Sequence, residues 1–241
     1  MKTQLFIISV SAISILMLSG CSKDKETSQK TDYLLINTTG DYTFAGNLDT
    51  SIYVSSSGPY ASSIKIDLNN DMTDDIEFYC SVYQHTVYNE WIAAVRTLNT
   101  NVSLNVEVDT VAIASFSIPL AIPPGDDSIT IYYNENYNPD KSYPANLTID
   151  KQINSYPVVC SVGDTLNEFC NWQTGTYGLI SDNHDQGQIQ NNILLGNWRN
   201  IGDKFIAVRF IENSVVHYGW IELGVMNYTI TLYKYALNRN Q

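Results

Sequence analysis

Carboxylate and amide side chains are concentrated in the segment "DLNNDMTDDIEF", residues 67–78, and give this chain its clearest candidate for ligand chemistry. Oxygen-bearing groups recur at alternate positions, supplied by Asp67, Asn69, Asp71, the backbone carbonyl of Thr73, and Asp75. Calcium takes six to eight oxygen ligands at about 2.3–2.6 Å, and a tightly folded chain supplies them at alternate residues. The spacing therefore predicts a structural Ca²⁺ site that would fix the connection between two strands.

Two positions of this segment depart from an EF-hand calcium loop. Met72 stands where such loops have glycine, and an L-residue pays about 1–2 kcal/mol to adopt the left-handed backbone that glycine permits. Phe78 occupies the twelfth position, where an EF-hand has its bidentate glutamate. The segment is nearer to the short DxNxDGxxD loops that link β-strands. Three interpretations stay open: a calcium site, a degenerate remnant of one, and an acidic turn.

Signatures of catalysis are absent from the sequence. The chain has three histidines, His85, His184 and His217. None lies in a GxSxG, HExxH or cysteine–histidine pattern. In the polar segment 181–192, Asp182, His184 and Asp185 could bind a metal or a substrate, although such a cluster more often belongs to a solvated loop. The sequence leans toward a protein that is not an enzyme, with a two-carboxylate glycoside hydrolase as the less favoured alternative.

Tryptophans supply the candidates for ligand binding. Trp91, Trp172 and Trp198 lie in the polar settings "YNEW", "CNWQTG" and "GNWRN". A sugar-binding platform needs exposed aromatic rings in such loops, so Trp172 and Trp198 are predicted ligand-binding residues. The competing interpretation is that each tryptophan covers an edge of the hydrophobic core. The chain is thus expected to be a glycan- or protein-binding module, or else a structural envelope protein with no soluble ligand.

Three cysteines, Cys80, Cys160 and Cys170, follow Cys21 in the chain. Outside the cytoplasm such residues can form lasting disulfides. Cys160 and Cys170 close the short loop "CSVGDTLNEFC" and are the predicted disulfide. Cys80 alternates with the apolar residues of "IEFYCSV", which is typical of a small buried core residue. A bridge from Cys80 to either of the others stays open.

The elements that must position these residues are β-strands throughout. Segments with a period of two recur at 51–55, 62–68, 75–82, 102–108, 111–118, 128–133, 205–211, 215–223 and 227–235. Alternation puts Ile206, Val208 and Phe210 on a core face and Arg209 on the opposite face. No segment after the first 31 residues has a convincing helical period. The pattern predicts an all-β chain with a single β-sandwich domain over residues 32–241, with a jelly roll as one possible arrangement.

The first residues read "MKTQLFIISVSAISILMLSGC" and predict a lipoprotein signal peptide over residues 1–20. The apolar run from Leu5 to Leu18 is too short to span a bilayer core of about 30 Å, but it suits a signal peptide. "LSGC" resembles a bacterial lipobox, which implies cleavage after Gly20 and lipidation of Cys21. Residues 21–31 are wholly polar after the cysteine and predict a flexible tether. Ser22 gives no inner-membrane retention signal, so the resemblance to bacterial lipoproteins implies a lipid anchor in the outer membrane, on its surface or its periplasmic face.

The composition limits the partners. The formal net charge is −12, and loss of Lys2 with the signal peptide would make it more negative. Nucleic acids and anionic membrane surfaces select basic patches, so this balance argues against both. The 17 tyrosines combine apolar bodies with polar tips, which suits strands, interfaces and sugar platforms alike.

The last third carries a resemblance to a known ending. "FIAVRFIENSVVHYGWIELGV" resembles the closing module of many bacterial surface lipoproteins, in which an "RF" strand precedes an "HYGW" strand. The matching residues are Arg209, Phe210, His217, Tyr218, Gly219 and Trp220. An acidic stretch such as 67–75 tends to accompany that ending. The resemblance implies a β fold and a surface location, and it implies no catalytic activity.

Overall fold

Alternation along each strand decides which side chains enter the core. In the strand Ile76–Gln84 one face carries four buried apolar residues, Ile76, Phe78, Cys80 and Val82. The opposite face carries Glu77, Tyr79, Ser81 and Tyr83. Successive side chains of a strand point to opposite sides of a sheet, so one short segment serves both the core and the surface. The expectation that Cys80 is a small core residue is confirmed.

The computed structural model describes residues 33–36, 42, 44–55, 60–84, 88–120, 129–185 and 191–238. These residues lie within one unit, Asp32–Gln241. The first eight strands are β1 (Leu34–Leu35), β2 (Phe44–Ile52), β3 (Ala61–Ile66), β4 (Ile76–Gln84), β5 (Tyr88–Thr97), β6 (Val102–Leu120), β7 (Ile129–Asn136) and β8 (Thr148–Pro157). The remaining strands are β9 (Thr165–Leu166), β10 (Trp172–Gln173), β11 (Thr176–Asp185), β12 (Asn191–Asn192), β13 (Leu194–Leu195), β14 (Ile201–Glu212), β15 (Val215–Met226) and β16 (Thr229–Asn238). The predicted signal peptide, Cys21 and the tether lie outside the described residues.

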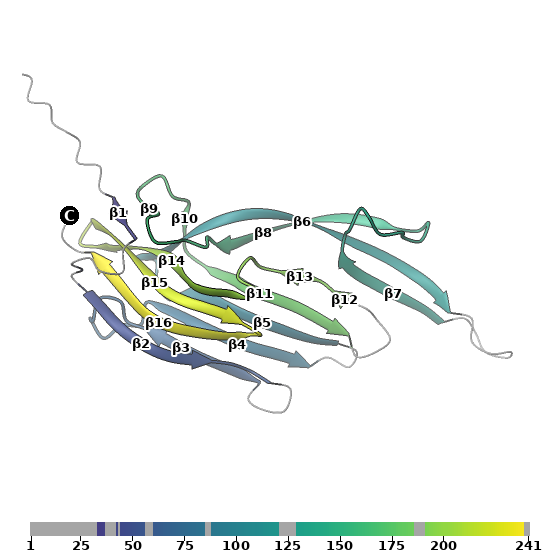
Figure 1. Ribbon diagram of the computed structural model, residues 1–241, viewed down its shortest axis with the longest axis horizontal. Coiled ribbons are helices and arrows are strands. Elements are labelled where there is room, and N and C mark those ends of the chain that lie inside the picture. Colours follow the sequence, from purple (N-terminus) through teal and green to yellow (C-terminus); the bar gives the residue numbers. More distant parts are fainter. Residues whose placement is uncertain are drawn as a thin grey trace, which may run out of the picture. The chain divides into compact units, whose positions relative to one another are not determined.

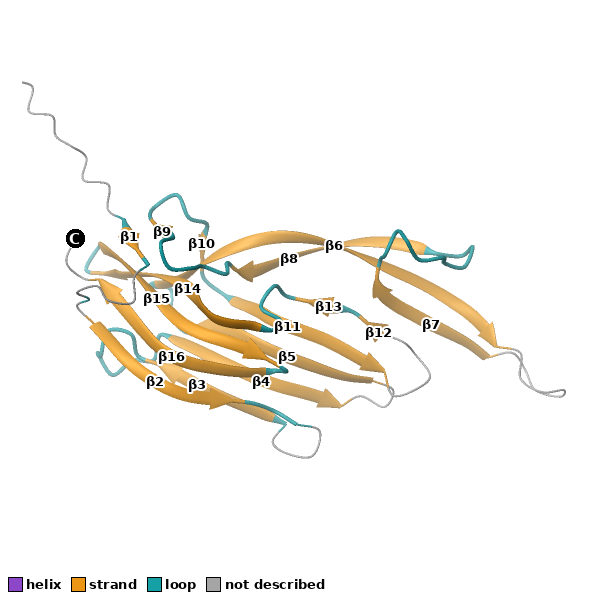
Figure 2. Ribbon diagram, in the orientation of Figure 1, coloured by secondary structure: helices purple, strands orange, loops and turns teal. Residues whose placement is uncertain are grey.

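The strands form two large sheets and one small one (Figures 1 and 2). Sheet I has the order β12-β7-β6-β14-β15-β16-β2, and β8 and β10 also pair with β6. Sheet II has the order β13-β11-β5-β4-β3, and the small sheet pairs β1 with β9. The hairpins β3-β4-β5 and β14-β15-β16 are meanders, and every pairing is antiparallel except that of β12 with β7.

The main core lies between sheets I and II. Sheet II contributes Phe78, Val95 and Leu179, and sheet I contributes Ile206, Val208 and Leu223. Trp198, which precedes β14, belongs to the same buried cluster. The predicted sidedness of Ile206, Val208 and Phe210 is confirmed, because all three belong to this core. The all-β class and the sandwich predicted from the sequence are therefore what the structure shows.

A second, smaller core covers the other face of sheet I. Phe205 and Ala207 of β14 and Trp220 of β15 face away from the main core and are buried all the same. Leu34 of β1, Ile36, which follows β1, and Leu166 of β9 pack onto them. Burial on both faces explains why "FIAVRF" is almost continuously apolar instead of alternating.

β6 is longer than the sequence pattern suggests. The expected strands 102–108 and 111–118 are one strand of 19 residues, because Asp109 and Thr110 continue the pairing with Asn154 and Ile153 of β8. The first part of β6 pairs with β14, and the rest pairs with β8 and then β7. Among the residues that the structure describes, none forms a helix long and apolar enough to cross a membrane.

Candidate functional site

The acidic segment forms the connection between β3 and β4, and its carboxylates hold the turn through backbone N–H groups. Oδ1 of Asp67 accepts from the backbone N–H of Asn69 and Asp71 at 3.3 and 3.2 Å, and Oδ2 accepts from Met72 at 2.7 Å. Oδ1 of Asp71 accepts from the N–H of Thr73 at 2.8 Å. The alternating residues thus fold around one another, as a calcium loop of this spacing would.

Met72 adopts the backbone that glycine has in such loops. Its φ is 72°, in the left-handed region, and its side chain is 99% exposed. Asn70 also has a left-handed φ of 59°. The side chain of Met72 contributes no burial that would offset the conformational cost of about 1–2 kcal/mol, so the hydrogen bonds of Asp67 must hold this turn.

Asp75 differs from the other acids because it is buried. Its Oδ2 accepts from the N–H of Leu68 at 2.9 Å, and its Oδ1 accepts from Nδ2 of Asn99 at 2.7 Å. Burial raises the pKa of Asp75, the two hydrogen bonds lower it in part, and the charges of Asp71 and Asp67 raise it further. A bound cation would stabilise the charged form of this group.

Metal coordination is not evident from the side chains alone. Among the described residues, no group of three or more His, Cys, Asp and Glu side chains converges as a metal site. Asn69 is buried and donates to Asp71 at 3.0 Å and to Glu212 of β14 at 3.4 Å. The loop is therefore tied to sheet I through Asn69, and calcium binding stays a prediction.

The two predicted tryptophans do not form an exposed platform. Trp198 is 0% exposed and donates from Nε1 to the carbonyl of Pro157 at 2.9 Å, so its ring cannot stack on a ligand. Trp172 is half-buried, stacks on Tyr218 with ring centroids 5.6 Å apart, and has Arg209 over its ring. Trp198 as a ligand-binding residue is a wrong expectation, since its indole completes the core. The other interpretation of this residue, burial at the core, holds.

Cys160 and Cys170 carry free thiols in the structure. Cys160 is buried in the second core, where burial raises its pKa to about 12, and the nearby charges of Asp164 and Cys170 act in the same direction. Cys170 is half-buried, and its Sγ lies 3.9 Å from the carbonyl of Thr165. The predicted Cys160–Cys170 bridge would join these two neighbouring thiols.

A face rich in tyrosine lies on the outside of sheet II and was not predicted. Tyr79, Ser81 and Tyr83 of β4 point away from the core, and the register places Ala94 of β5 beside Tyr79. We call this surface the tyrosine face, defined by Glu77, Tyr79, Ser81 and Tyr83 of β4 and Arg96 of β5. The signal for this face is present in "IEFYCSVY", where Tyr79 and Tyr83 fall on the side of the strand opposite the core residues.

The tyrosine face carries two cavities that share Tyr79. The first has a volume of about 400 Å³ and is lined by Tyr79, Ser81, Tyr83 and Arg96, with Ala61 and Ser63 of β3 on its far side. The second has a volume of about 490 Å³ and extends from Tyr79 across Ala94 and Gly178 to residues 153–156 of β8. The residues at the base of both cavities have small side chains, such as Ser81 in the first and Gly178 in the second, so both cavities are depressions open to solvent.

Charges on this face are paired. Arg96 forms an ion pair with Glu77 across the β4–β5 ladder, and its guanidinium lies 5.7 Å from the centre of the Tyr79 ring. Burial raises the pKa of the Tyr79 phenol, Arg96 lowers it in part, and Tyr83 and Glu77 raise it. The phenol is therefore neutral at ordinary pH and can both donate and accept a hydrogen bond.

Ser81 lies between the two tyrosines and has an unused hydroxyl. Ser81 is 5% exposed, and its Oγ has no hydrogen-bond partner among the described protein atoms. An unsatisfied buried hydroxyl costs about 1–3 kcal/mol. A polar group at the base of the first cavity is thus available to a ligand.

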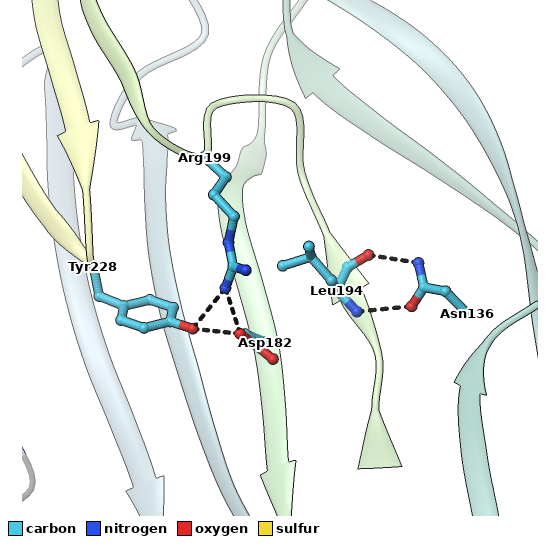
Figure 3. Close-up of polar contacts among 5 residues, drawn as sticks. All are labelled: Asn136, Asp182, Leu194, Arg199 and Tyr228. Atoms are coloured by element: carbon cyan, nitrogen blue, oxygen red, sulfur yellow. Dashed lines mark hydrogen bonds and ion pairs between the residues drawn. The ribbon is translucent and has the colours of Figure 1, made fainter.

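A second polar cluster joins Asp182 of β11, in sheet II, to Arg199 and Tyr228 (Figure 3). Oδ2 of Asp182, from β11, accepts from Nη2 of Arg199 and from the hydroxyl of Tyr228, both at 2.5 Å. Tyr228 belongs to the two-residue turn between β15 and β16, with φ of 62°, and its ring lies 5.2 Å from that of Trp91. Burial, and then the hydrogen bond to Asp182, raise the pKa of Tyr228, so this phenol is no base or nucleophile at neutral pH.

This cluster changes the interpretation of the polar segment 181–192. Asp182 is buried instead of solvated. The side chains of His184 and Asp185 lie outside the described residues, as does His85. Nearby, the side-chain amide of Asn136 brackets the backbone of Leu194, donating at 2.9 Å and accepting at 2.8 Å (Figure 3). These contacts hold β11, β13 and β7 in place.

Among the described residues, the tyrosine face offers two adjoining cavities to a ligand, and the acidic loop lies at one edge of it, because residues 67–75 connect β3 to β4. Arg209 and His217 of the resembled ending lie on adjacent strands, where Arg209 pairs with Tyr218 and Phe210 with His217.

Comparisons of the chain with protein-family models, with curated protein sequences and with solved structures found no match.

Proposed function

We propose that this protein is a cell-envelope lipoprotein, held in the outer membrane through Cys21, whose β-sandwich binds a glycan on the tyrosine face without catalysing a reaction. The observation that carries the proposal is the pair of cavities on one sheet face, both lined by Tyr79. Ligand sites in proteins are concave, with aromatic walls and a few placed polar groups. The tyrosine face has these properties.

Tyrosine rings with adjacent hydrogen-bonding groups suit sugars. A pyranose ring has an apolar C–H face and hydroxyls around its rim, so it is recognised by an aromatic ring combined with polar side chains. Tyr83 is 54% exposed and offers its ring to solvent, while the neutral phenol of Tyr79 and the hydroxyl of Ser81 offer hydrogen bonds. A folded protein partner would instead bury about 800 Å² of this protein's surface, which is a larger area than one sugar chain covers.

Calcium would have a structural part in this function. The acidic loop joins β3 and β4, the two strands that line most of the first cavity. A cation bound by Asp67, Asn69, Asp71, Thr73 and Asp75 would fix the spacing of these strands at one end. Calcium would then support the binding face without touching the ligand.

Pull-down on insoluble polysaccharides and affinity electrophoresis on soluble ones test the proposal. Tyr83→Ala should lower glycan binding about tenfold, the loss typical of an aromatic residue at the centre of a site. Tyr53→Ala is the matched control, because Tyr53 is also 54% exposed but lines neither cavity. Equal losses in both variants, or no retention of the unaltered protein on any polysaccharide, would refute the proposal.

A further inference from the structure

The two cavities of the tyrosine face are close enough to hold one ligand. The shared residue, Tyr79, lies on the β4 strand, with the first cavity toward β3 and the second toward β11. From β3 to β11 the face crosses three inter-strand spacings of about 4.8 Å, or roughly 14 Å. A ligand seated in both cavities must therefore be extended and lie across the strands.

The charged side chains of the tyrosine face indicate whether its ligand is charged or neutral. Glu77 and Arg96 are the charged residues that line the two cavities, and they pair with each other. Lys65, which faces Glu77 in the register, is paired with Asp74 at 3.6 Å. An anionic ligand would thus meet no unpaired cation among the described residues that line the cavities, and the formal net charge of −12 would repel it.

Glu77 is equally unavailable to a cationic ligand. Its side chain is 7% exposed and is held by Arg96. Separating this pair to serve a ligand would leave a buried carboxylate without a partner, which is strongly unfavourable. What the face offers instead is neutral: phenol and serine hydroxyls, the amide of Asn154 and the hydroxyl of Thr176.

The floor of the second cavity is open because position 178 is glycine. A Cβ atom added to Gly178 would meet no atom within 4 Å, and its φ lies outside the region that favours glycine. The space above Gly178 is therefore available to a ligand, bounded on one side by residues 153–156 of β8. A larger side chain at this position would fill the cavity without disturbing the sheet.

We infer that the tyrosine face binds an uncharged, linear glycan that lies across β3, β4, β5 and β11 and occupies both cavities at once, with Tyr79 between its two halves. This inference rests on the proposed function and narrows it to neutral chains. A chain of several sugar rings contacts Tyr83, Tyr79 and the floor at Gly178 in turn. A short oligosaccharide fills one cavity and loses the contacts in the other.

The test compares chain charge and chain length on the purified full-length protein. Affinity electrophoresis uses neutral β-glucans, xyloglucan, galactomannan and α-glucan beside the acidic polymers alginate and polygalacturonate. Calorimetry then uses neutral oligosaccharides of increasing length. We expect binding to at least one neutral polymer, little retention by the acidic ones, and an affinity that rises at least tenfold from disaccharide to hexasaccharide.

Two variants locate the ligand. Gly178→Leu fills the second cavity and should remove the gain in affinity with chain length. Gly202→Leu is the matched control, since an added Cβ at Gly202 also meets no atom within 4 Å and Gly202 lines neither cavity. Ser81→Ala should weaken binding of every length without lowering the melting temperature, because it removes an unsatisfied hydroxyl.

The outcomes separate the inference from the proposed function. Tight binding to acidic polymers alone, lost in Tyr83→Ala, would keep the glycan-binding function and overturn the inference. An unchanged length dependence in Gly178→Leu would also overturn it, because the second cavity would then hold no sugar. Absence of binding to all the polymers would refute both.

Discussion

Asp182 and Arg199 form an ion pair of 2.5 Å, and this pair joins β11 in sheet II to the segment that leads into β14 of sheet I. The carboxylate side chain is 7% exposed and that of the arginine is 39% exposed. Tyr228 donates to the same carboxylate oxygen, so one buried acid receives two donors from different parts of the chain.

Removal of the guanidinium should destabilise the fold. Arg199→Ala removes one of the donors to a buried carboxylate, and we expect a loss of about 1–3 kcal/mol in the free energy of unfolding. Urea unfolding measures this loss. Lys65→Ala breaks the exposed pair with Asp74 and should cost no more than about 0.5 kcal/mol. Equal losses of unfolding free energy in Arg199→Ala and Lys65→Ala would show that the Asp182–Arg199 pair stabilises the fold no more than an exposed ion pair does.

Alkaline pH should weaken the protein through Tyr228. Its pKa is raised in the folded state above the ordinary tyrosine value of 10.0, so the unfolded chain releases this proton at lower pH than the native one does. The stability that the tyrosine contributes is therefore complete below pH 10.0 and falls as the pH rises above it. Above this pH, the melting temperature of Tyr228→Phe should fall less steeply with rising pH than that of the unaltered protein. A slope that stays the same would mean that other tyrosines carry the effect.

Replacement of Met72 by glycine should stabilise the protein. With φ of 72° and an exposed side chain, Met72 bears the left-handed strain without compensation. Met72→Gly should raise the free energy of unfolding by about 0.5–1.5 kcal/mol, since the strain of about 1–2 kcal/mol is partly offset by the greater freedom of glycine when unfolded. Met226→Gly, at another exposed methionine whose φ is not left-handed, should have the opposite sign.

Melting in millimolar calcium and in EDTA tests the acidic loop. A ligand at 100 times its dissociation constant adds about 2.7 kcal/mol, which is roughly 5–11 °C for a domain of this size. Asp71→Ala should abolish the shift. Identical melting temperatures in the two buffers would leave the second and third interpretations, a degenerate remnant or an acidic turn.

Counting of reactive thiols tests the predicted disulfide. Cys80 and Cys160 are buried, with pKa values raised to about 12 by burial, so neither should react in the native protein at neutral pH. If Cys160 and Cys170 are bridged in the oxidised protein, denaturation should expose one reactive thiol, that of Cys80, because lipidation turns the sulfur of Cys21 into a thioether. Three such thiols would contradict the bridge.

Alternation made the fold predictable, and β4 shows why. Because Ile76, Phe78 and Val82 share a period of two, the sequence alone identifies the strand and its core face. β5 was missed because "WIAAVRT" has two small buried residues in succession, Ala93 and Ala94, one on each face. The division of β6 was wrong because the polar pair Asp109 and Thr110 reads as a turn, whereas pairing with β8 continues through it.

The candidate site was less predictable, because exposure depends on the packing of distant segments. Trp198 lies in a polar stretch, yet its side chain enters the core and donates to Pro157, 41 residues away. The polar face of β4 could be identified from sequence. That Gly178, Ala94 and residues 153–156 would adjoin it to form a cavity depends on the pairing of β5 with β11 and on the position of β8.

The second core gives the chain a mechanical property. β1 is joined to β9 over two residues, while Leu34 and Ile36 are embedded in the aromatic cluster on sheet I. A pull on the chain ahead of Tyr33 would load these two side chains before it reached any hydrogen bond of the sandwich. Under tension β1 would therefore detach from β9 and from the second core first, and the sheets that carry the tyrosine face would stay folded.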